Sequence, residues 1–320
     1  QRQMCIRDSN SPDPDNEYFS DGLTEEVIGD LSRIDALRVI SRTTAMRLKG
    51  MEQDLRSIAH ELDVRYILEG SVRKAGNSLR ITAQLIDTRT DSPVWADKYS
   101  GTLDDVFEIQ EQVSRAIVDS LKVKLSVEEE QRLVVPAVNP VAYDAFLRAR
   151  RDIWSFTQEG VDKALRELQD ALEIVGEDVL LYRGLGLANW QYVNAGLSGD
   201  PAYIERAEDY ARRIIAIDPE SHHGFSLLGY IAVQKGDIAT WVRQFERAVA
   251  VEPRDPDYLM WLAMGWLVAG HTDRAEPYQA RLLSIDPLMD LLHFSLGLAK
   301  YHAGDFEGAL ELFKKAHQLS

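Results

Sequence analysis

A period of 34 residues in the last third of the chain is the feature that most constrains its fold. Three kinds of residue recur with this spacing: prolines that follow an acidic residue, glycines, and small residues. They are Pro219, Pro253, Pro287; Gly236, Gly270, Gly304; and Gly229, Ala263, Gly297. This period in a helical pattern is typical of helix–turn–helix units that stack into a solenoid. Such a fold indicates a binding surface but does not name what it binds.

One unit, residues 222–255, shows why the spacing is fixed. Phe225 and Ala232 lie two helical turns apart and predict one buried face of a first helix. Gly229, on the same helix, leaves room for a second helix to approach closely. Gly236 stands where the first helix must end and the chain reverse, a position that often needs positive φ. Pro253 cannot continue the second helix and therefore ends it.

The recurrence of these positions in register resembles the tetratricopeptide repeat family. The resemblance implies an all-α solenoid of about five repeats over residues 141–320, preceded by an acidic linker at 128–140. One unit is longer than the period, which predicts an insertion in its inter-helix loop at 194–202. Two positions depart from the family pattern. Trp241 stands where the family usually has alanine, and Pro277, early in a second helix, predicts a kink or a delayed start.

In this repeat family, particular positions of the first helices line a concave groove, so the resemblance implies a candidate partner-binding site. The expected groove residues are Tyr230, Met260, Met264, Leu267, Phe294, Leu298 and Tyr301. An aromatic and Met-rich groove favours a protein or peptide with an apolar or amphipathic helical segment. The Lys and Asn with which family members hold chaperone C-terminal carboxylates are absent here. The alternative is that these side chains pack against the next repeat or a second copy of the chain.

The first part of the chain has a different pattern, which predicts a small α+β domain over residues 10–127. Stretches with helical spacing alternate with stretches of period two, in the order α-β-α-β-β-β-α. The expected elements are helices near 21–34, 54–62 and 103–125, and strands at 37–41, 65–73, 79–88 and 94–99. The whole chain is thus predicted to be a compact α+β domain followed by an elongated right-handed solenoid.

Several segments of this domain resemble TolB-like amino-terminal domains. They are Asp15–Glu26, Leu68–Arg73, Arg80–Asp87 and Phe107–Gln110. Such a domain followed by tetratricopeptide repeats resembles the C-terminal arm of bacterial signalling proteins. The effector there is commonly a class III nucleotidyl cyclase, a winged-helix regulator or a Ser/Thr kinase domain. The resemblance implies a scaffolding arm that senses or binds a partner. The alternative is a fragment of an adenylate/guanylate cyclase or a winged-helix regulator whose effector domain lies upstream.

The TolB-like family usually places an apolar strand before the segment that begins at Asp15. Residues 1–9 have mixed charge and no clear period, so we interpret them as a non-native leader outside the fold. A sheet without this strand keeps an unpaired edge, which invites pairing with another chain. The sequence therefore predicts that the chain self-associates more readily than a form extended upstream with native sequence.

The charge balance excludes some partners. The chain has 36 basic and 52 acidic residues, a net charge of −16, and the acidity is spread over both halves. Neither half suits a phosphate backbone, so we expect no direct nucleic-acid contact. The longest apolar window, Met260–Ala269, is too short to span a bilayer, and no signal peptide is visible. We expect a cytoplasmic location, or a periplasmic or membrane-tethered one if a transmembrane helix lies upstream.

Residues suited to catalysis or metal binding form no recognisable constellation. His222 and His223 are adjacent on a helix, where side chains point apart, which favours a helix start over joint metal ligation. Gly184 and Gly186 lack the preceding strand of a phosphate loop, and Cys5 has no positioned partner. We therefore expect no enzyme activity, cofactor or metal in this region.

The sequence also contains one basic cluster. We interpret it as an ordinary solvated edge of the fold, with a docking patch as the alternative. It comprises Arg33, Arg38, Arg42, Arg47 and Lys49.

Overall fold

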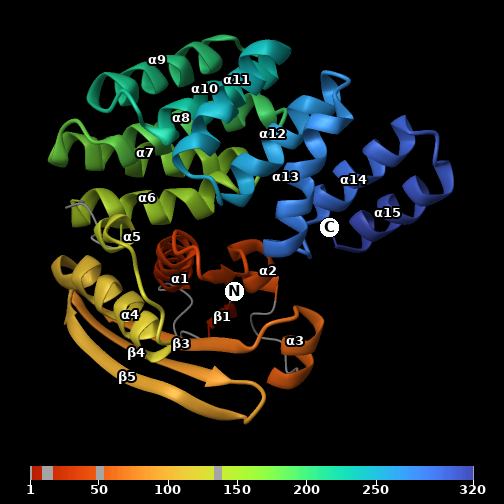
Figure 1. The fold of residues 1–320 in the computed structure, drawn as a ribbon. Coiled ribbons are helices and arrows are strands. Elements are labelled where there is room, and N and C mark those ends of the chain that lie inside the picture. The colour runs from red at the N-terminus through yellow and green to blue at the C-terminus, as the bar shows by residue number, and fades with distance from the viewer. Residues whose placement is uncertain (1, 9–16, 48–53, 133–138, 320) are drawn as a thin grey trace. The chain divides into compact units, whose positions relative to one another are not determined.

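The computed structural model describes residues 2–8, 17–47, 54–132 and 139–319, and it divides into two compact units (Figure 1). The first unit comprises residues 1–140 together with Ser284–Met289. The second comprises Val141–Leu283 and Asp290–Ser320. Residues 10–16 at the start of the predicted α+β domain, residues 133–138 of the predicted linker, and Lys49 of the basic cluster lie outside the described residues.

The first unit is built on a five-stranded sheet with the strand order β2-β1-β3-β4-β5. The strands are β1 (Arg2–Asp8), β2 (Leu37–Val39), β3 (Tyr66–Ala75), β4 (Ser78–Asp87) and β5 (Ser92–Thr102). Strand β1 pairs in parallel with β2 and β3, whereas β3, β4 and β5 form an antiparallel meander. The strands predicted at 65–73 and 79–88 form a hairpin, and Gly76 takes the positive φ of 58° that its tight turn requires.

The interpretation of residues 1–9 as a leader outside the fold is wrong for Arg2–Asp8. These residues form β1, which lies between β2 and β3 in the sheet. Met4, Cys5 and Ile6 are all buried. A strand that is buried on both faces has a short run of apolar residues and no alternation of apolar and polar residues. The run here is only three residues long and has charged residues on either side, so it is a weak signal of a strand. Because β1 pairs with β3, the sheet has no unpaired edge at β3, and the prediction of one is wrong.

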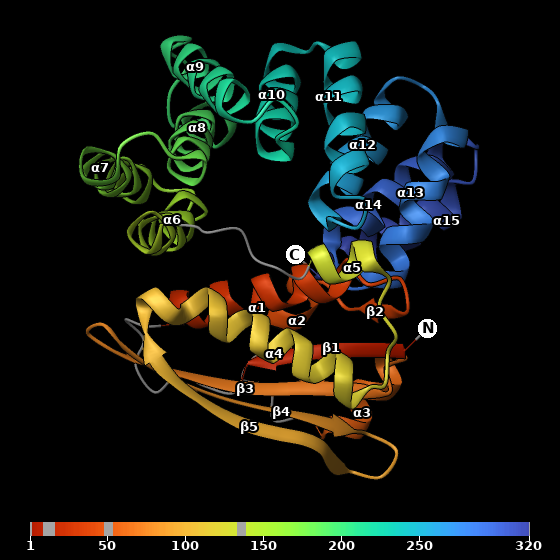
Figure 2. The same ribbon diagram turned by 60° about the vertical axis from the view of Figure 1, so that its left-hand side comes forward.

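Helices cover one face of this sheet. The helical elements described in this unit are α1 (Glu17–Ser32), α2 (Arg42–Arg47), α3 (Leu55–Glu61), the 3₁₀ turn η2 (Leu103–Asp105), α4 (Val106–Ser120) and α5 (Val127–Arg132). Helices α1 and α4 lie on the same side of the sheet (Figure 2). Val27 of α1 and Val113 of α4 meet Val72 of β3 and Ile81 of β4 around a small cavity of about 50 Å³. Helix α5 begins at Val127 and continues into the stretch that the sequence predicted to be linker.

The second unit is all-α. Its helices are α6 (Pro140–Ile153), α7 (Gln158–Val175), α8 (Val179–Asn194), α9 (Ala202–Ile217), α10 (His222–Lys235), α11 (Ile238–Val251), α12 (Pro256–Val268), α13 (Thr272–Ile285), α14 (Asp290–His302) and α15 (Phe306–Leu319). Over the described residues they follow the chain as five helix pairs. The predicted insertion falls in the loop between α8 and α9. The first unit combines a sheet with helices, and the second unit is all-α. The prediction of an α+β domain followed by an all-α solenoid is therefore confirmed.

The periodic residues have the roles that their spacing predicts. Gly236, Gly270 and Gly304 have φ values of 68°, 83° and 80°, the left-handed region that ends a helix without a Cβ clash. Pro277 lies inside α13, which already begins at Thr272, so the start of that helix is not delayed.

Trp241 has a structural reason for departing from the family's alanine. Its indole Nε1 donates a hydrogen bond to the Trp261 carbonyl oxygen of the next repeat at 2.8 Å.

Candidate functional site

A ladder of aromatic rings joins the first helices of successive repeats. Trp190 of α8 lies 5.0 Å from Tyr230 of α10, and Tyr230 lies 5.4 Å from Trp261 of α12, measured between ring centroids. The Trp190 indole Nε1 also donates to the Tyr230 carbonyl oxygen at 3.1 Å. Trp190 and Tyr230 are buried, and burial raises the pKa of the Tyr230 hydroxyl well above its usual value. The ladder is therefore packing between repeats and not an accessible surface.

The expected groove residues fall into classes that differ in exposure. Tyr230, Met260 and Leu267 are buried, with only 2% of Met260 exposed, so they cannot contact a partner in this conformation. For these three residues, packing within the repeats is the reading that the structure supports. Met264 and Leu298 are half-buried and pack on the core formed by Ala263, Leu267 and Ala275.

The last two expected residues are accessible. Phe294 is 41% and Tyr301 55% exposed, and both lie on α14 two helical turns apart. Phe294 lies 5.4 Å from Phe313, and Tyr301 lies 5.5 Å from Phe306, both on α15.

Three further exposed apolar residues of the same two helices join this surface. They are Leu291, Phe306 and Leu310. We call Leu291, Phe294, Tyr301, Phe306 and Leu310 the terminal apolar surface. These three residues were not among those predicted from the sequence, although their helical spacing from Phe294 and from Phe313 is readable there.

Charges beside this surface hold the α14–α15 turn. Asp305 accepts a hydrogen bond from the backbone N–H of Gly308 at 3.0 Å, and it pairs with Lys300 at 3.0 Å. The backbone N–H of Gly308 and then Lys300 lower the pKa of the Asp305 carboxyl group. The turn that presents Tyr301 and Phe306 is therefore fixed by an ionised cap.

The histidine pair differs from the expected arrangement. The side chains of His222 and His223 do not point apart, because their ring centroids are 3.9 Å apart. His222 Nδ1 lies 2.9 Å from the hydroxyl of buried Tyr258. Among the described residues, no group of three or more His, Cys, Asp or Glu side chains is placed to hold a metal ion.

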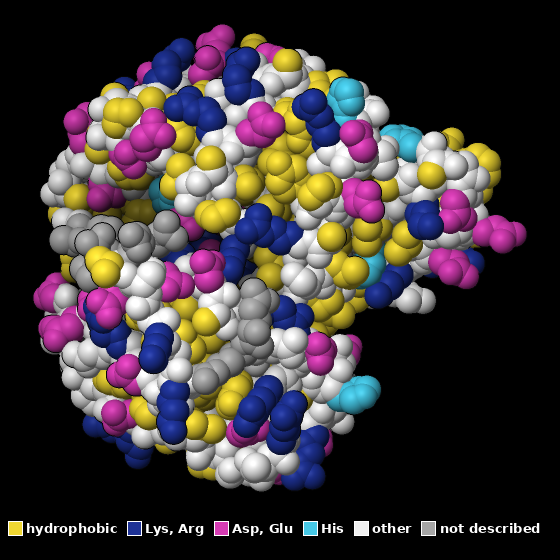
Figure 3. All heavy atoms as spheres, viewed as in Figure 1, with side chains coloured by type: hydrophobic (Ala, Val, Ile, Leu, Met, Phe, Trp, Pro, Cys, Tyr) yellow, Lys and Arg dark blue, Asp and Glu magenta, His cyan; other side chains and the backbone are white. Residues whose placement is uncertain are grey.

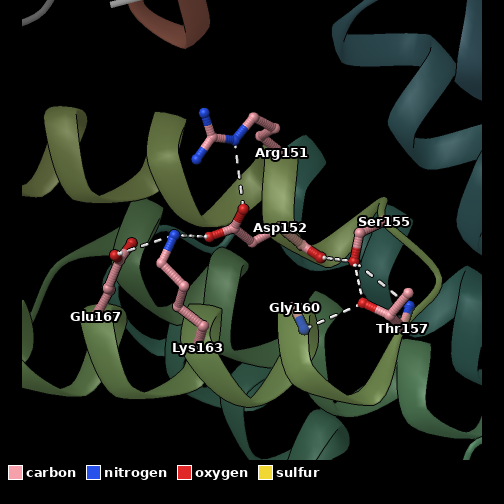
Figure 4. A network of polar contacts seen from close by, with 7 residues as sticks. All are labelled: Arg151, Asp152, Ser155, Thr157, Gly160, Lys163 and Glu167. Atoms are coloured by element: carbon pink, nitrogen blue, oxygen red, sulfur yellow. Dashed lines mark hydrogen bonds and ion pairs between the residues drawn. The ribbon is translucent and has the colours of Figure 1, made fainter. Parts of the chain in front are cut away.

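A dense polar network lies at the α6–α7 turn (Figure 4). The Asp152 carboxylate forms ion pairs with Lys163 Nζ at 2.7 Å and with Arg151 Nε at 3.3 Å. The hydroxyl oxygens of Ser155 and Thr157 are 2.9 Å apart. Thr157 Oγ1 also accepts a hydrogen bond from the backbone N–H of Gly160, so Thr157 caps the start of α7. Every charge shown has an opposite partner, so the network fixes a turn and supplies no free acid–base pair.

Three arginines of the basic cluster near β2 have partners within the first unit. Arg42 pairs with Glu25 at 2.8 Å, Arg33 lies 3.8 Å from Asp30, and Arg38 donates to the backbone carbonyls of Leu62 and Asp63. For these residues, this favours the ordinary edge over a docking patch. On the face seen in Figure 3, Lys and Arg side chains stand among Asp and Glu side chains.

Family models match both parts of the chain. Residues 226–290 and 267–320 match the tetratricopeptide repeat model. The C-terminal helices are tetratricopeptide repeats. Repeats of this class are protein-interaction scaffolds, so this part of the chain is a partner-binding module. Residues 13–119 match the second domain of HilA/YgeH-like transcriptional regulators. The expected TolB-like resemblance of the same region stays a prediction.

One curated relative is named "Putative adenylate cyclase 3", from Rhizobium meliloti (strain 1021). It is 37% identical over 246 residues, which cover 75% of this chain and 40% of the relative. This chain therefore matches less than half of the relative's length.

Similar solved structures include MamA, with 19% identity and a TM-score of 0.39 over 62% of this chain and 96% of that one. Another is TTC0263, a tetratricopeptide protein of Thermus thermophilus, with 17% identity and a TM-score of 0.44 over 56% of this chain and 91% of that one. None of the helices in the described ranges is long and apolar enough to cross a membrane.

Proposed function

We propose that this chain is the protein-binding arm of a larger bacterial signalling protein. Its partner is a protein that presents an amphipathic helix to the terminal apolar surface. The observation that carries the proposal is the exposure of Phe294 and Tyr301, whose equivalents in the preceding repeat, Met260 and Leu267, are buried. The repeat family supports a binding role, and the cyclase named among the relatives supports a signalling context.

The chemistry of the surface suits a helix. Leu291, Phe294, Leu298 and Tyr301 follow one another at spacings of three or four residues, so they form a stripe along α14. A partner helix with apolar residues at the same spacing buries its own stripe against this one. Exposed large apolar and aromatic residues in a cluster are the usual anchors of such interfaces.

The experiment uses the full chain and a labelled amphipathic peptide with leucines at helical spacing, read out by fluorescence anisotropy. The double variant Phe294→Glu/Tyr301→Glu should lose affinity by roughly tenfold or more, because a desolvated carboxylate replaces each anchor. The matched control is Ile174→Glu, which places the same charge on an exposed apolar position of α7. Equal loss in the control, or no loss in the double variant, would refute the proposal.

Two outcomes separate the alternatives for this surface. If light scattering shows a dimer that Phe294→Glu dissociates, a second copy of the chain is the occupant. If the chain stays monomeric and captures the peptide, the occupant is a separate partner.

A second candidate is a role in transcriptional regulation. The match of residues 13–119 to the second domain of HilA/YgeH-like regulators favours it. In this reading the same repeats bind a protein partner, and an upstream domain contacts DNA. Identifying the domain encoded upstream in the gene distinguishes a cyclase from a regulator.

A further inference from the structure

The face of the sheet that points away from α1 and α4 carries an unusual set of charges. Val72 and Ile81 are paired in register and turn toward α4, so the residues next to them turn the other way. Arg73 stands directly opposite Arg80 on this open face, and Arg80 stands opposite Ser100 of β5. One step along, Thr82 stands between Ser71 and Lys98.

Arg73, Arg80 and Lys98 are exposed, and in the described ranges none of them has an ion pair. Glu69, an acid on this face, stands two rows from Arg73 and Arg80 and one row from Lys98, and it accepts a hydrogen bond from Gln84 at 3.1 Å. Like charges directly opposite each other on neighbouring strands, about 5 Å apart at Cβ, are destabilising. The contrast is with other arginines of the same unit, such as Arg65, which pairs with Asp87 at 2.7 Å.

We propose that this open sheet face binds an acidic peptide segment through Arg73, Arg80 and Lys98. The peptide's carboxylates pair with the three cations, and the hydroxyls of Ser71, Thr82 and Ser100 lie between them as hydrogen-bond donors. Binding would relieve the repulsion between Arg73 and Arg80. The fold itself gains no stability from placing these two cations opposite each other. This site is separate from the terminal apolar surface and does not depend on it.

Charge complementarity favours a peptide over a nucleic acid. The chain carries a net charge of −16, so its long-range field repels an extended phosphate backbone. A short peptide meets only the local field, because screening limits charge interactions to about 10 Å at 0.1 M salt. Ala96 of β5, which stands opposite Gln84 on this face, is exposed and can cover apolar side chains of the same peptide.

The test measures binding of a fluorescein-labelled oligoglutamate peptide to the full chain at low and high salt. The wild type should bind, and its affinity should fall as salt rises. Arg73→Gln/Arg80→Gln should weaken binding by roughly tenfold while the melting temperature is unchanged or raised, because the repulsion is removed. The matched control is Arg89→Gln, an exposed arginine of the same unit that lies off this face.

Lys98→Gln is a second variant near the sheet edge, and it should weaken binding without unfolding the chain. Unchanged affinity in both variants, or an equal fall in the Arg89→Gln control, overturns the proposal. Tighter binding of a single-stranded oligodeoxynucleotide than of the peptide also overturns it.

Discussion

Gly297 of α14 lies against the ring of Phe313 of α15 so closely that a Cβ on the glycine would stand 2.5 Å from it. The same relationship holds two periods earlier between Gly229 and Phe245, again at 2.5 Å. These two helix pairs are therefore closed by a phenylalanine ring that packs where the glycine has no side chain. This contact explains why a small residue recurs at these positions.

Replacing Gly229 with alanine should destabilise the repeat region by roughly 1–3 kcal/mol, because the Phe245 ring must move in a well-packed core. The matched control is Gly29→Ala in α1, where an added Cβ meets nothing within 4 Å. That change should stabilise the helix by roughly 0.5–1 kcal/mol. Urea unfolding of both variants checks the prediction, and a neutral Gly229→Ala would contradict it.

The repeat fold could be predicted from the sequence because its signals are local. A glycine at positive φ and a proline after a helix act through their own backbone, so a fixed spacing of Gly236 and Pro253 specifies the helix ends without any long-range information. The accessible surface could not be predicted in the same way. Met260 and Phe294 occupy equivalent positions of successive repeats, yet one is buried and the other exposed, because exposure depends on what packs beside each repeat.

Strand β1 was missed for a different reason. Its pairing partners are β2 and β3, which lie about thirty and sixty residues further along the chain, so local pattern carries little of the information. The charged residues on either side of Met4–Ile6 also hide the apolar run.

The Cys5 thiol tests this strand directly. Cys5 is 0% exposed in the structure, so a thiol reagent should react with the native chain only as fast as the sheet opens. Labelling should become rapid once urea unfolds the first unit. Fast labelling of the native chain, at the rate of the unfolded chain, would show that β1 is not held between β2 and β3.

Glutamate substitutions at Met260 and Phe294 should separate core from surface. Met260→Glu buries a charge and should cost at least about 3 kcal/mol of stability. Phe294→Glu replaces an exposed side chain and should cost about 1 kcal/mol or less. Thermal and urea unfolding give both values. If Phe294→Glu is as destabilising as Met260→Glu, then Phe294 is a core residue and the terminal apolar surface loses its central member.

The last prediction concerns acid stability of the sheet. Asp87 at the end of β4 accepts Arg65 Nη2 at 2.7 Å and Nε at 3.1 Å, and its other oxygen accepts the N–H of Arg89 at 3.0 Å. The Arg65 hydrogen bonds hold the pKa of the Asp87 carboxyl group below its ordinary value, against the opposing effect of burial. The folded state therefore favours the ionised carboxylate.

A depressed carboxyl pKa stabilises the fold above the unfolded pKa of about 4, and this contribution is lost as the pH falls through the lower folded value. Asp87→Asn should therefore lower the melting temperature at neutral pH and flatten its fall below about pH 4. Asp104→Asn, at an exposed carboxylate of the same unit, is the control and should leave the acid limb of the curve in place. Melting temperatures measured across this pH range check the prediction. If the melting temperature of Asp87→Asn falls with pH in the same way as that of the wild type, the Arg65 contact contributes nothing to stability.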